Sequence, residues 1–276
     1  MKTYLINLDR SPDRLEFFRS QAQAVGVSFE RIPAIDGRSL PETTWKSIVD
    51  KRFEFQPINV YEVAVFLSHK AIWERMIRDG VSMAAIFEDD AILAPQIAST
   101  LRSIANSKIS FDVIKLETTL RRVVLTESGV PLASGESLHQ LKSWHGGAAG
   151  YVLSLEGAGK LSKATNLISD QVDQAMFNPL SKISSSLKIL QCNPAVCVQK
   201  DLLHRGQPVT FTSTIERKNT RGRLFRHGLF IDLYRLVKKL QQKRLAKRLA
   251  KQSENIQAIV QMSSLESAEH PKSIAA

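Results

Sequence analysis

Three adjacent carboxylates, Glu88-Asp89-Asp90, follow an apolar run at residues 81–87 and precede another at 91–93. Carboxylates this close raise one another's pKa values unless positive charge lies nearby, and the sequence shows no evident counter-charge for them. Carboxylate oxygens, together with substrate phosphates, are the ligands that Mg²⁺ and Mn²⁺ prefer. The triplet therefore predicts a divalent-cation site at the end of a strand, with a solvated acidic turn as the alternative interpretation.

Polar residues also close two strands that we expect near the N-terminus. Asp9 and Arg10 follow the first strand, at residues 3–8, and Asp36 follows the second, at residues 29–34, with apolar residues at helical spacing between them. This order predicts an α/β fold with a mainly parallel central sheet, whose ligands bind at the carboxyl ends of the strands. We therefore expect Asp9, Arg10 and Asp36 to face one crevice.

A capping box of Asn59 and Glu62 predicts a helix that ends near Asp79. This helix carries His69 and Trp73 on an apolar side, where a lone histidine is a core residue more often than a catalytic one. We interpret Trp73 as a core residue. Further strands are expected at residues 83–87, 112–116, 122–125, 149–154, 188–190 and 195–199, and further helices after Pro95 and at residues 157–164 and 170–177.

The net charge of +11 is concentrated in one segment. Residues 217–251 hold thirteen Lys or Arg residues against Asp232 alone, which leaves a charge of −1 for the rest of the chain. Apolar residues share one side of a helix expected at 227–251, which is typical of a basic amphipathic helix on an anionic membrane. Packing against the body and RNA binding are the alternatives. We expect an α/β domain at residues 1–216, a basic amphipathic helical tail at 217–252 and disorder at 253–276.

The compartment follows from what the sequence lacks. No run of residues is long and apolar enough to cross a bilayer, and residues 1–9 are too short and too soon charged for a signal peptide. We therefore expect a cytoplasmic protein. Cys192 and Cys197 have no His or Cys partners at zinc-binding spacing, so we expect two reduced, buried thiols.

Five segments follow one another in a recognisable order: Asn7-Leu8-Asp9-Arg10-Ser11-Pro12-Asp13-Arg14, Ala34-Ile35-Asp36-Gly37, Ser68-His69-Lys70-Ala71-Ile72-Trp73, Phe87-Glu88-Asp89-Asp90 and Gly150-Tyr151-Val152-Leu153-Ser154. Together they resemble glycosyltransferase family 25, which contains bacterial lipooligosaccharide sugar transferases and the collagen galactosyltransferases. The resemblance covers about residues 1–200 and leaves out the basic tail. It weakens at residues 60–66, which lack the glycines usual in the family, and there we expect altered helix packing rather than altered chemistry.

The resemblance implies a GT-A-like, Rossmann-like nucleotide-sugar domain, a UDP-sugar donor, a divalent metal (Mn²⁺ or Mg²⁺) and inversion at the anomeric carbon. It implies metal contact by Asp90 and Glu88, and alternate residues after a strand do point the same way. Such a metal stabilises the charge that develops on a diphosphate leaving group. The residues expected to bind the donor nucleotide are Asn7, Asp9, Arg10, Asp36, His69, Glu88 and Asp89.

Arginine is suited to the phosphates of such a donor, because its guanidinium group offers forked donors. Arg10 and Arg14 are both available for this purpose. The alternative is that this segment only begins a helix, with acidic side chains as its caps. We place Arg10 in the site, and we assign Asp13 and Arg14 to the helix start.

An inverting transferase needs a base that takes the proton of the acceptor hydroxyl. The resemblance places this base at Asp173, with Glu117 and Asp170 as further candidates, and an exposed helical acid is the alternative interpretation of Asp173. His145 and His204 are considered as a third metal ligand, but we interpret each as an ordinary surface or loop histidine.

The favoured function is transfer of a hexose, first of all galactose from UDP-galactose, to a lipid-linked lipooligosaccharide acceptor at the inner face of the cytoplasmic membrane. The alternative is a nucleic-acid-binding module that uses residues 217–251. No nucleic-acid-binding fold signature precedes that segment, so we expect no nucleic acid partner. A third class, phosphoryl transfer, lacks its phosphate-binding Gly-x-x-x-x-Gly-Lys loop here.

Overall fold

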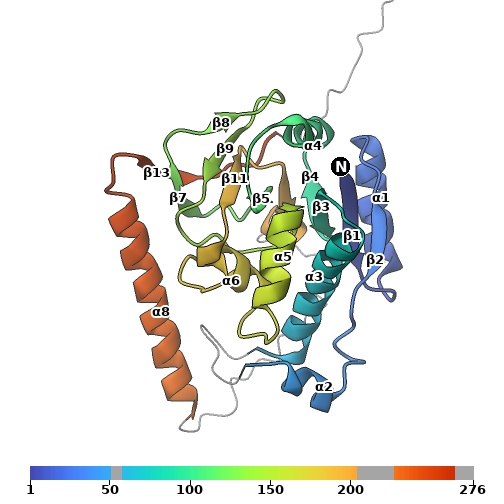
Figure 1. Cartoon of the computed structure of the whole chain (residues 1–276), viewed down its shortest axis with the longest axis vertical. Coiled ribbons are helices and arrows are strands. Elements are labelled where there is room, and N and C mark those ends of the chain that lie inside the picture. Colours follow the sequence, from blue (N-terminus) through green and yellow to red (C-terminus); the bar gives the residue numbers. More distant parts are fainter. Residues whose placement is uncertain (51–57, 204–226, 265–276) are drawn as a thin grey trace, which may run out of the picture.

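The structure is a computed structural model that describes residues 1–50, 58–203 and 227–264. Its centre is an eight-stranded sheet with the strand order β2-β1-β3-β10-β5-β11-β9-β8 (Figure 1). Apolar runs rich in Val, Ile, Tyr and Phe supply most of these strands, because such side chains pack well on a pleated surface. The strands are β1 (Lys2–Asn7), β2 (Glu30–Pro33), β3 (Met83–Glu88), β5 (Val113–Lys115), β8 (Val130–Pro131), β9 (Ser137–Gln140), β10 (Gly150–Ser154) and β11 (Ile189–Asn193).

The directions of the strands agree only in part with the expected, mainly parallel sheet. β2, β1 and β3 run parallel, as do β5 and β11. β10 lies antiparallel between β3 and β5, and β9 and β8 add an antiparallel edge. The sheet is therefore mixed. An apolar run of strand length does not indicate the direction of its neighbour, so the sequence could not predict this.

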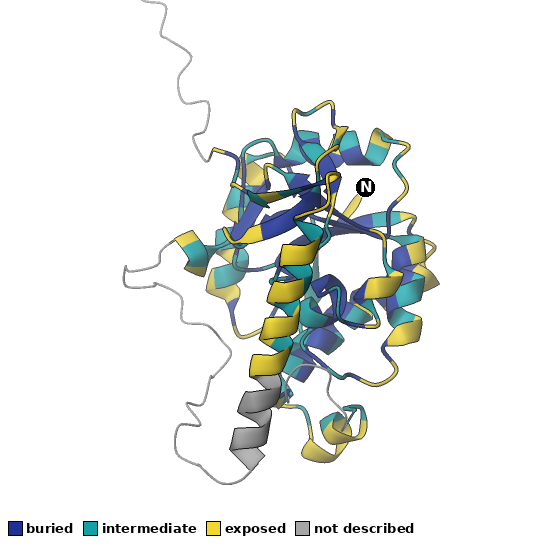
Figure 2. Ribbon diagram, turned by 90° about the vertical axis from the view of Figure 1, so that its left-hand side faces the viewer, coloured by how far each residue is buried: buried dark blue, intermediate teal, exposed yellow. Residues whose placement is uncertain are grey.

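Helices cover both faces of the sheet, and its strands are buried between them (Figure 2). Side chains alternate along β1, so that Tyr4 packs on one face with Trp73, whereas Leu5 packs on the other face with Phe18. The first face carries α3 (Val60–Arg78), α5 (Leu155–Ala164) and α6 (Val172–Phe177), and the second carries α1 (Pro12–Ala24) and α4 (Ile97–Asn106).

The capping box expected at the start of α3 is confirmed. Asn59 Oδ1 accepts hydrogen bonds from the backbone N–H groups of Tyr61 (2.9 Å) and Glu62 (3.0 Å), and Glu62 Oε2 accepts one from the backbone of Asn59 (2.8 Å). Such a cap contributes about 1 kcal/mol to helix stability. Val63 and Phe66, which stand in the segment without the family's glycines, are buried in the core. The cap fixes the start of α3 after Asn59, and α3 carries His69 against the face of the sheet that holds Tyr4.

A three-stranded sheet in the order β4-β12-β6 brings together three segments that are far apart in the sequence. β12 (Cys197–Gln199) pairs antiparallel with β4 (Ala91–Leu93) and parallel with β6 (Glu117–Thr118). Asp90 precedes β4, Glu117 opens β6 and Gln199 ends β12. The sequence did not predict the short elements β4, β6, β8, β9, α2 (Glu42–Ser47) and α7 (Lys200–Leu203).

The C-terminal segment contains helix α8 (His227–Leu249), which runs beside the body (Figure 1), and strand β13 (Asn255–Ile259). β13 pairs antiparallel with β7 (Arg122–Thr126). Val260 is fully buried, and its carbonyl accepts a hydrogen bond of 2.5 Å from Thr118 Oγ1. The expected disorder of residues 253–276 is therefore wrong for this strand. The pairing is with a distant segment, which local composition does not reveal. The expected boundary at residue 216 lies outside the described residues.

Two further expectations concern membrane spans and thiols. In the part of the chain that the structure describes, no helix combines the length and the apolar character that crossing a bilayer requires. Cys192 and Cys197 are both buried as free thiols, as expected. Burial raises the pKa of both thiols, which keeps them in the unreactive, protonated form.

Candidate active site

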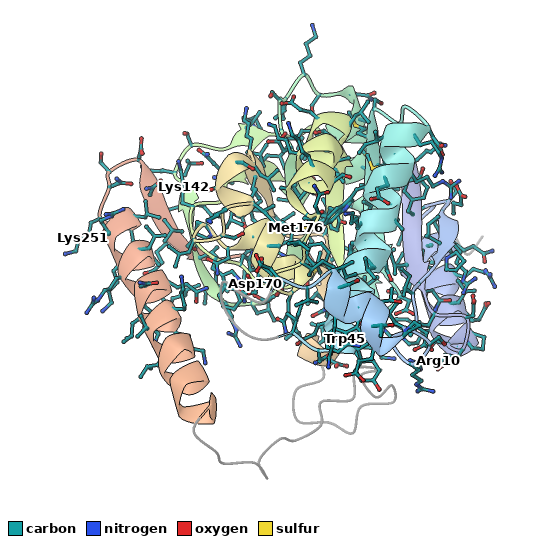
Figure 3. All side chains as sticks on the ribbon, turned by 60° about the horizontal axis from the view of Figure 1, so that its bottom comes forward. Arg10, Trp45, Lys142, Asp170, Met176 and Lys251 are labelled. Atoms are coloured by element: carbon teal, nitrogen blue, oxygen red, sulfur yellow. The ribbon has the colours of Figure 1, made fainter. Side chains whose placement is uncertain are left out.

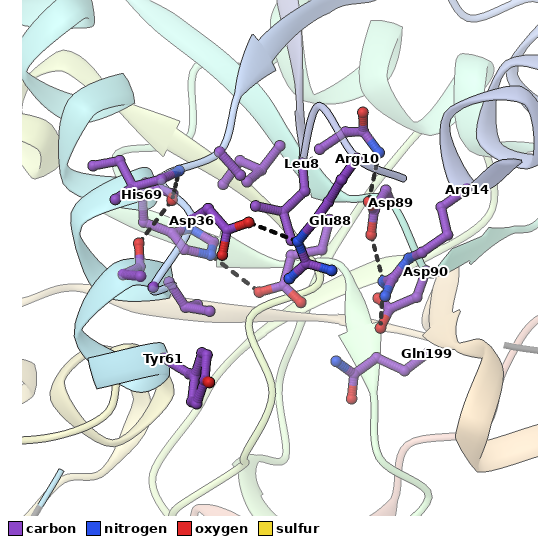
Figure 4. Close-up of a pocket in the computed structure, with 18 of the residues that line it drawn as sticks. Leu8, Arg10, Arg14, Asp36, Tyr61, His69, Glu88, Asp89, Asp90 and Gln199 are labelled. Carbon is purple, nitrogen blue, oxygen red and sulfur yellow. Dashed lines mark hydrogen bonds and ion pairs between the residues drawn. The ribbon is translucent and has the colours of Figure 1, made fainter. Parts of the chain in front are cut away.

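A cavity of about 210 Å³ opens where β1 and β3 end, between α1 and α3 (Figure 4). This is the edge of the sheet at which the strand pattern predicts a ligand site. The structure brings most of the expected polar residues to this cavity, namely Asn7, Arg10, Asp36, His69, Glu88, Asp89 and Asp90. It adds polar residues that the sequence analysis did not place in a site, namely Arg14, Tyr61, Ser68, Gln199 and Asp201.

Asp9 does not line the cavity, contrary to expectation. Its side chain is 79% exposed and pairs with Arg31, because β1 ends at Asn7 and the following turn carries Asp9 outward. Arg31 Nε donates a hydrogen bond of 2.9 Å to Asn7 Oδ1, and Asn7 Nδ2 donates one of 2.7 Å to Asp89 Oδ2. Asp9 is therefore connected to the cavity through Arg31 and Asn7.

The counter-charge that the acidic triplet lacks in the sequence is Arg14, in the first turn of α1. Arg14 pairs with Asp89 and lies 3.2 Å from Asp90 Oδ2 (Figure 4). Burial works to lower the pKa of Arg14, but the charges of Asp90, Asp89 and Glu88 outweigh it and raise the pKa. The assignment of Arg14 to the helix start was therefore incomplete: the helix begins at Pro12 and aims Arg14 at the triplet.

Asp89 and Asp90 differ in how the protein satisfies their oxygens. Both oxygens of Asp89 are engaged, one by Asn7 and the other by Arg14. Asp90 Oδ1 is buried and has no hydrogen-bond partner among the described residues. Burial, followed by the charge of Glu88, raises the pKa of Asp90 to about 8. Asp89 thus joins β1 to the end of β3, and Asp90 keeps an oxygen available for a cation.

A divalent cation fits this arrangement only together with a ligand. Among the described residues, no group of three or more His, Cys, Asp or Glu side chains is arranged to hold a metal. Mg²⁺ and Mn²⁺ are commonly bound by one or two carboxylates that share the ion with substrate phosphates. Asp90, with its free oxygen, and Glu88, two residues away, match that requirement.

Glu88 is held by a chain of hydrogen bonds that starts in the core. Trp73 Nε1 donates to the hydroxyl of Tyr151 (3.0 Å), which lies 2.9 Å from His69 Nδ1, and His69 Nε2 lies 3.0 Å from Glu88 Oε1. An ionised Glu88 carboxylate can only accept, which assigns the imidazole proton to Nε2, and Nδ1 of the neutral ring then accepts from the hydroxyl of Tyr151. Burial works to raise the pKa of Glu88, but His69 and the cations Arg14 and Lys115 outweigh it and lower the pKa. His69 is therefore a buried residue that orients a carboxylate of the cavity, and its expected role in donor binding stays a prediction.

The loop after β2 forms the opposite wall. Arg10 Nε donates a hydrogen bond of 2.6 Å to Asp36 Oδ2. Burial works to raise the pKa of Asp36, but the hydrogen bonds from Arg10 and from the backbone of Arg38 outweigh it and lower the pKa. At Gly37 an added Cβ would lie 2.8 Å from the ring of Tyr61, so only glycine allows the loop to pack this closely on α3.

Glu117 and Asp173 are not among the residues that line this cavity. Glu117 is fully buried and accepts hydrogen bonds from Lys115 Nζ (3.1 Å) and from the backbone N–H of Ala149 (2.9 Å). Burial raises the pKa of Glu117 to about 7, although Lys115 opposes it. Asp173 Oδ2 accepts a hydrogen bond of 3.0 Å from Gly147, and a Cβ at Gly147 would overlap the Glu117 carboxylate. Gly147 therefore joins the two acids that were expected as catalytic candidates.

The remaining candidates for the base and for a third metal ligand are buried in the fold or lie outside the described residues. Asp170 is 1% exposed, whereas Asp173 is half-buried. His145 is buried, not a surface residue: its Nδ1 lies 2.8 Å from Gln191 Oε1, and its Nε2 accepts from the backbone of Thr119. Burial, with the charge of Lys115, lowers the pKa of His145 to about 3. Both of its ring nitrogens are engaged in the fold, which excludes metal binding in this conformation. His204 lies outside the described residues.

Comparisons with known proteins identify the family and several relatives of this chain. Residues 1–176 match the family model of glycosyltransferase family 25, described as an LPS biosynthesis protein. The lacto-N-neotetraose biosynthesis glycosyltransferase LgtB of Neisseria gonorrhoeae is 27% identical over 210 residues, which cover 72% of this chain and 75% of that protein. The lipooligosaccharide biosynthesis protein lex-1 of Haemophilus influenzae is 32% identical over 57% of this chain and 55% of that protein. Procollagen galactosyltransferase 1-A of Xenopus laevis is 25% identical over 67% of this chain and 32% of that protein.

Proposed function

Because the chain belongs to glycosyltransferase family 25, we propose that it transfers a hexose from a UDP-sugar to a lipooligosaccharide core, with inversion at the anomeric carbon. Galactose is the first choice of sugar, since one relative is named a galactosyltransferase. The lipooligosaccharide acceptor is supported by the name of lex-1 and by the description of the family. The mixed sheet with its ligand cavity at the strand ends is compatible with a GT-A-like domain.

The observation that carries the proposal is the mixture of charges in the cavity. Two ion pairs, Arg10 with Asp36 and Arg14 with Asp90, line the cavity that a nucleoside diphosphate would enter. The guanidinium groups would donate to phosphate oxygens, and Asp36 would accept from a hydroxyl of the donor. Asp90 and Glu88 would hold Mn²⁺ or Mg²⁺, which supplies charge stabilisation for the leaving diphosphate.

The acceptor side of the reaction would depend on Asp173. Two backbone N–H groups, of Gly147 and Gln174, hold its carboxylate at 3.0 Å and 2.8 Å. A carboxylate oriented in this way can accept the proton of an incoming hydroxyl while that hydroxyl attacks the sugar. Asp173 would therefore act on the acceptor and not on the donor.

A panel of UDP-sugars tests the proposed function. We expect metal-dependent hydrolysis of one UDP-sugar, first of all UDP-galactose, and faster turnover when a lipooligosaccharide acceptor is added. The released UDP would be measured with Mn²⁺, with Mg²⁺ and with a chelator. Equal and negligible turnover of every UDP-sugar, in a protein that remains folded by circular dichroism, would contradict the proposal.

A membrane-bound acceptor requires the enzyme to work at a bilayer surface, and we place it at the inner face of the cytoplasmic membrane through α8. Exposed apolar residues, Val237 and Leu240, lie on the same side of this helix as the cations Arg244 and Arg248, because these positions are three or four residues apart. Apolar side chains flanked by cations are suited to the headgroup layer of an anionic membrane.

Neutral substitutions on this outer side test the membrane proposal. We expect the triple variant Arg244→Gln, Lys247→Gln and Arg248→Gln to bind anionic vesicles roughly 100-fold more weakly, because each surface cation contributes about 1 kcal/mol. Vesicle co-sedimentation at several salt concentrations measures this effect. Deletion of residues 227–276 is unsuitable, because it removes β13.

The matched control replaces three exposed cations of the body that have no ion pair among the described residues, namely Arg102, Lys108 and Lys163. That control should bind vesicles as the unmodified protein does. Equal loss in both triple variants would mean that overall charge, and not α8, governs binding.

A further inference from the structure

A second cavity, of about 590 Å³, lies between α8 and the body. Figure 3 shows side chains of α8 reaching across toward the strands and loops beside it. The body contributes the loop before β7 and the segment before Gly146-Gly147, and α8 contributes one side of its middle turns. The lining residues are Arg121, Arg122, Ser143, Trp144, Gln174, Lys238, Lys239, Gln242, Lys243 and Ala246.

The described residues that line this cavity carry only positive charges. Five of its ten lining residues are Arg or Lys, and none is acidic. Among the described residues, no carboxylate lies within ion-pair distance of the two body arginines, Arg121 and Arg122, or of Lys239 and Lys243. Lys239 and Lys243 also stand one turn apart on α8, a like-charge spacing that destabilises a helix. A cavity that gathers five cations from two elements concentrates positive potential and attracts anions.

A second observation links this cavity to the reaction. Trp144 Nε1 is buried without a hydrogen-bond partner among the described residues, so its N–H group remains available to a ligand. A Cβ added at Gly146 would lie 3.1 Å from the indole of Trp144 and 3.3 Å from Asp173 Oδ2. Gln174, which also lines the cavity, follows Asp173 directly. Asp173, which we place at the acceptor hydroxyl, therefore lies next to two residues that line the cationic cavity.

We propose that this cavity binds an anionic substituent, a phosphate or a carboxylate, carried by the acceptor glycan. The cations hold the anion, and the indole of Trp144 offers a flat apolar face and an N–H donor to the neighbouring sugar. The inference rests on the proposed function and extends it, since it names the chemical class of the acceptor. In this arrangement the two sides of α8 differ: cations on the inner side select the acceptor, and the outer side meets the membrane.

The test compares one sugar with and without a phosphate, using glucose 6-phosphate and glucose as probes. UDP and Mn²⁺ are present at saturation so that the donor cavity is filled. Binding is followed by tryptophan fluorescence, and the Trp144→Phe variant identifies the signal of Trp144. We expect glucose 6-phosphate to change this fluorescence at concentrations at least tenfold lower than glucose.

The decisive comparison is between two pairs of cations on one helix. The inner pair, Lys239→Gln with Lys243→Gln, should weaken glucose 6-phosphate binding at least tenfold and leave glucose unaffected. The outer pair, Arg244→Gln with Lys247→Gln, carries the same loss of charge and should bind both sugars normally. Equal affinity for the phosphorylated sugar in the two pairs, or no preference for it in the unmodified protein, would overturn the proposal.

Two further measurements separate this proposal from others. The inner pair of cations could bind lipid headgroups instead. The inner variant would then lose binding to anionic vesicles but bind glucose 6-phosphate as the unmodified protein does, and this result would contradict the proposal. If the proposed function were wrong, no UDP-sugar would be turned over, whereas sugar phosphate binding in this cavity would still be measurable. In an active enzyme, the inner pair should raise KM for a phosphorylated acceptor about tenfold with kcat and donor hydrolysis unchanged.

Discussion

Asp90→Asn is expected to lower the rate of sugar transfer by roughly 1,000-fold, because it removes a charged ligand from the site of the proposed metal. The amide keeps the shape of the side chain, and its carbonyl can still accept from Arg14, which lies 3.2 Å from Asp90 Oδ2. Steady-state rates with added Mn²⁺ measure the effect. A chelator should inactivate the unmodified enzyme to a similar extent, and Mn²⁺ should restore it.

The stability of this variant provides the control. Burial raises the pKa of Asp90 to about 8, above its value of 3.8 in the unfolded chain. Ionisation of this group therefore destabilises the fold as the pH rises from the lower pKa to the higher one. A neutral amide avoids this cost, and at pH 7 the Tm should therefore not fall. Asp13→Asn, which removes an exposed acid from the first turn of the same helix, should leave the rate unchanged and cost at most about 1 kcal/mol of stability. Full turnover of Asp90→Asn, or of the native enzyme in chelator, would remove the metal from the mechanism.

Asp173→Asn is expected to reduce transfer to the acceptor by about 100- to 10,000-fold, the range that a general base contributes. The amide oxygen can still accept one of the two backbone hydrogen bonds, from Gly147 or Gln174, so the loop should keep its place. Binding of the UDP-sugar and its slow hydrolysis should change by no more than about threefold, because the base acts on the incoming hydroxyl.

Calorimetric titration with UDP separates this outcome from unfolding. Glu127→Gln, which changes an exposed acid directly after β7, is the matched control and should behave like the native enzyme. A normal transfer rate in Asp173→Asn would move the role of base to Glu117 or Asp170. Loss of UDP binding together with transfer would instead indicate that Asp173 only supports the structure.

The sequence predicted those parts of the site that depend on local pattern. The capping box at Asn59 fixed the start of α3, and the apolar run before Glu88 placed the triplet at a strand end, as the structure confirms. The position of Arg14 could not be predicted, because its partners Asp89 and Asp90 lie about 75 residues away and are reached only through packing of α1 on the sheet. The chain from Trp73 through Tyr151 to Glu88 was missed for the same reason.

The direction of β10 and the existence of β13 were also beyond the sequence pattern. A strand of five residues does not encode its partner, and Asn255–Ile259 alternates too weakly between apolar and polar residues to stand out from its polar surroundings. The cationic cavity requires the same kind of information, since Arg121 and Lys239 come together only when α8 is placed beside β7.

The pairing of β13 with β7 leaves the growing chain vulnerable during synthesis. β7 leaves the ribosome long before β13 has been synthesised. Thr126 in β7, for example, pairs with Asn255 in β13. Until then, one edge of a strand that contains Val123, Val124 and Leu125 remains open, and open apolar edges pair readily with other chains. A chain that ends within α8, or between α8 and β13, would keep this edge of β7 open permanently. Such fragments would be prone to aggregation even though every residue of the donor cavity is already present.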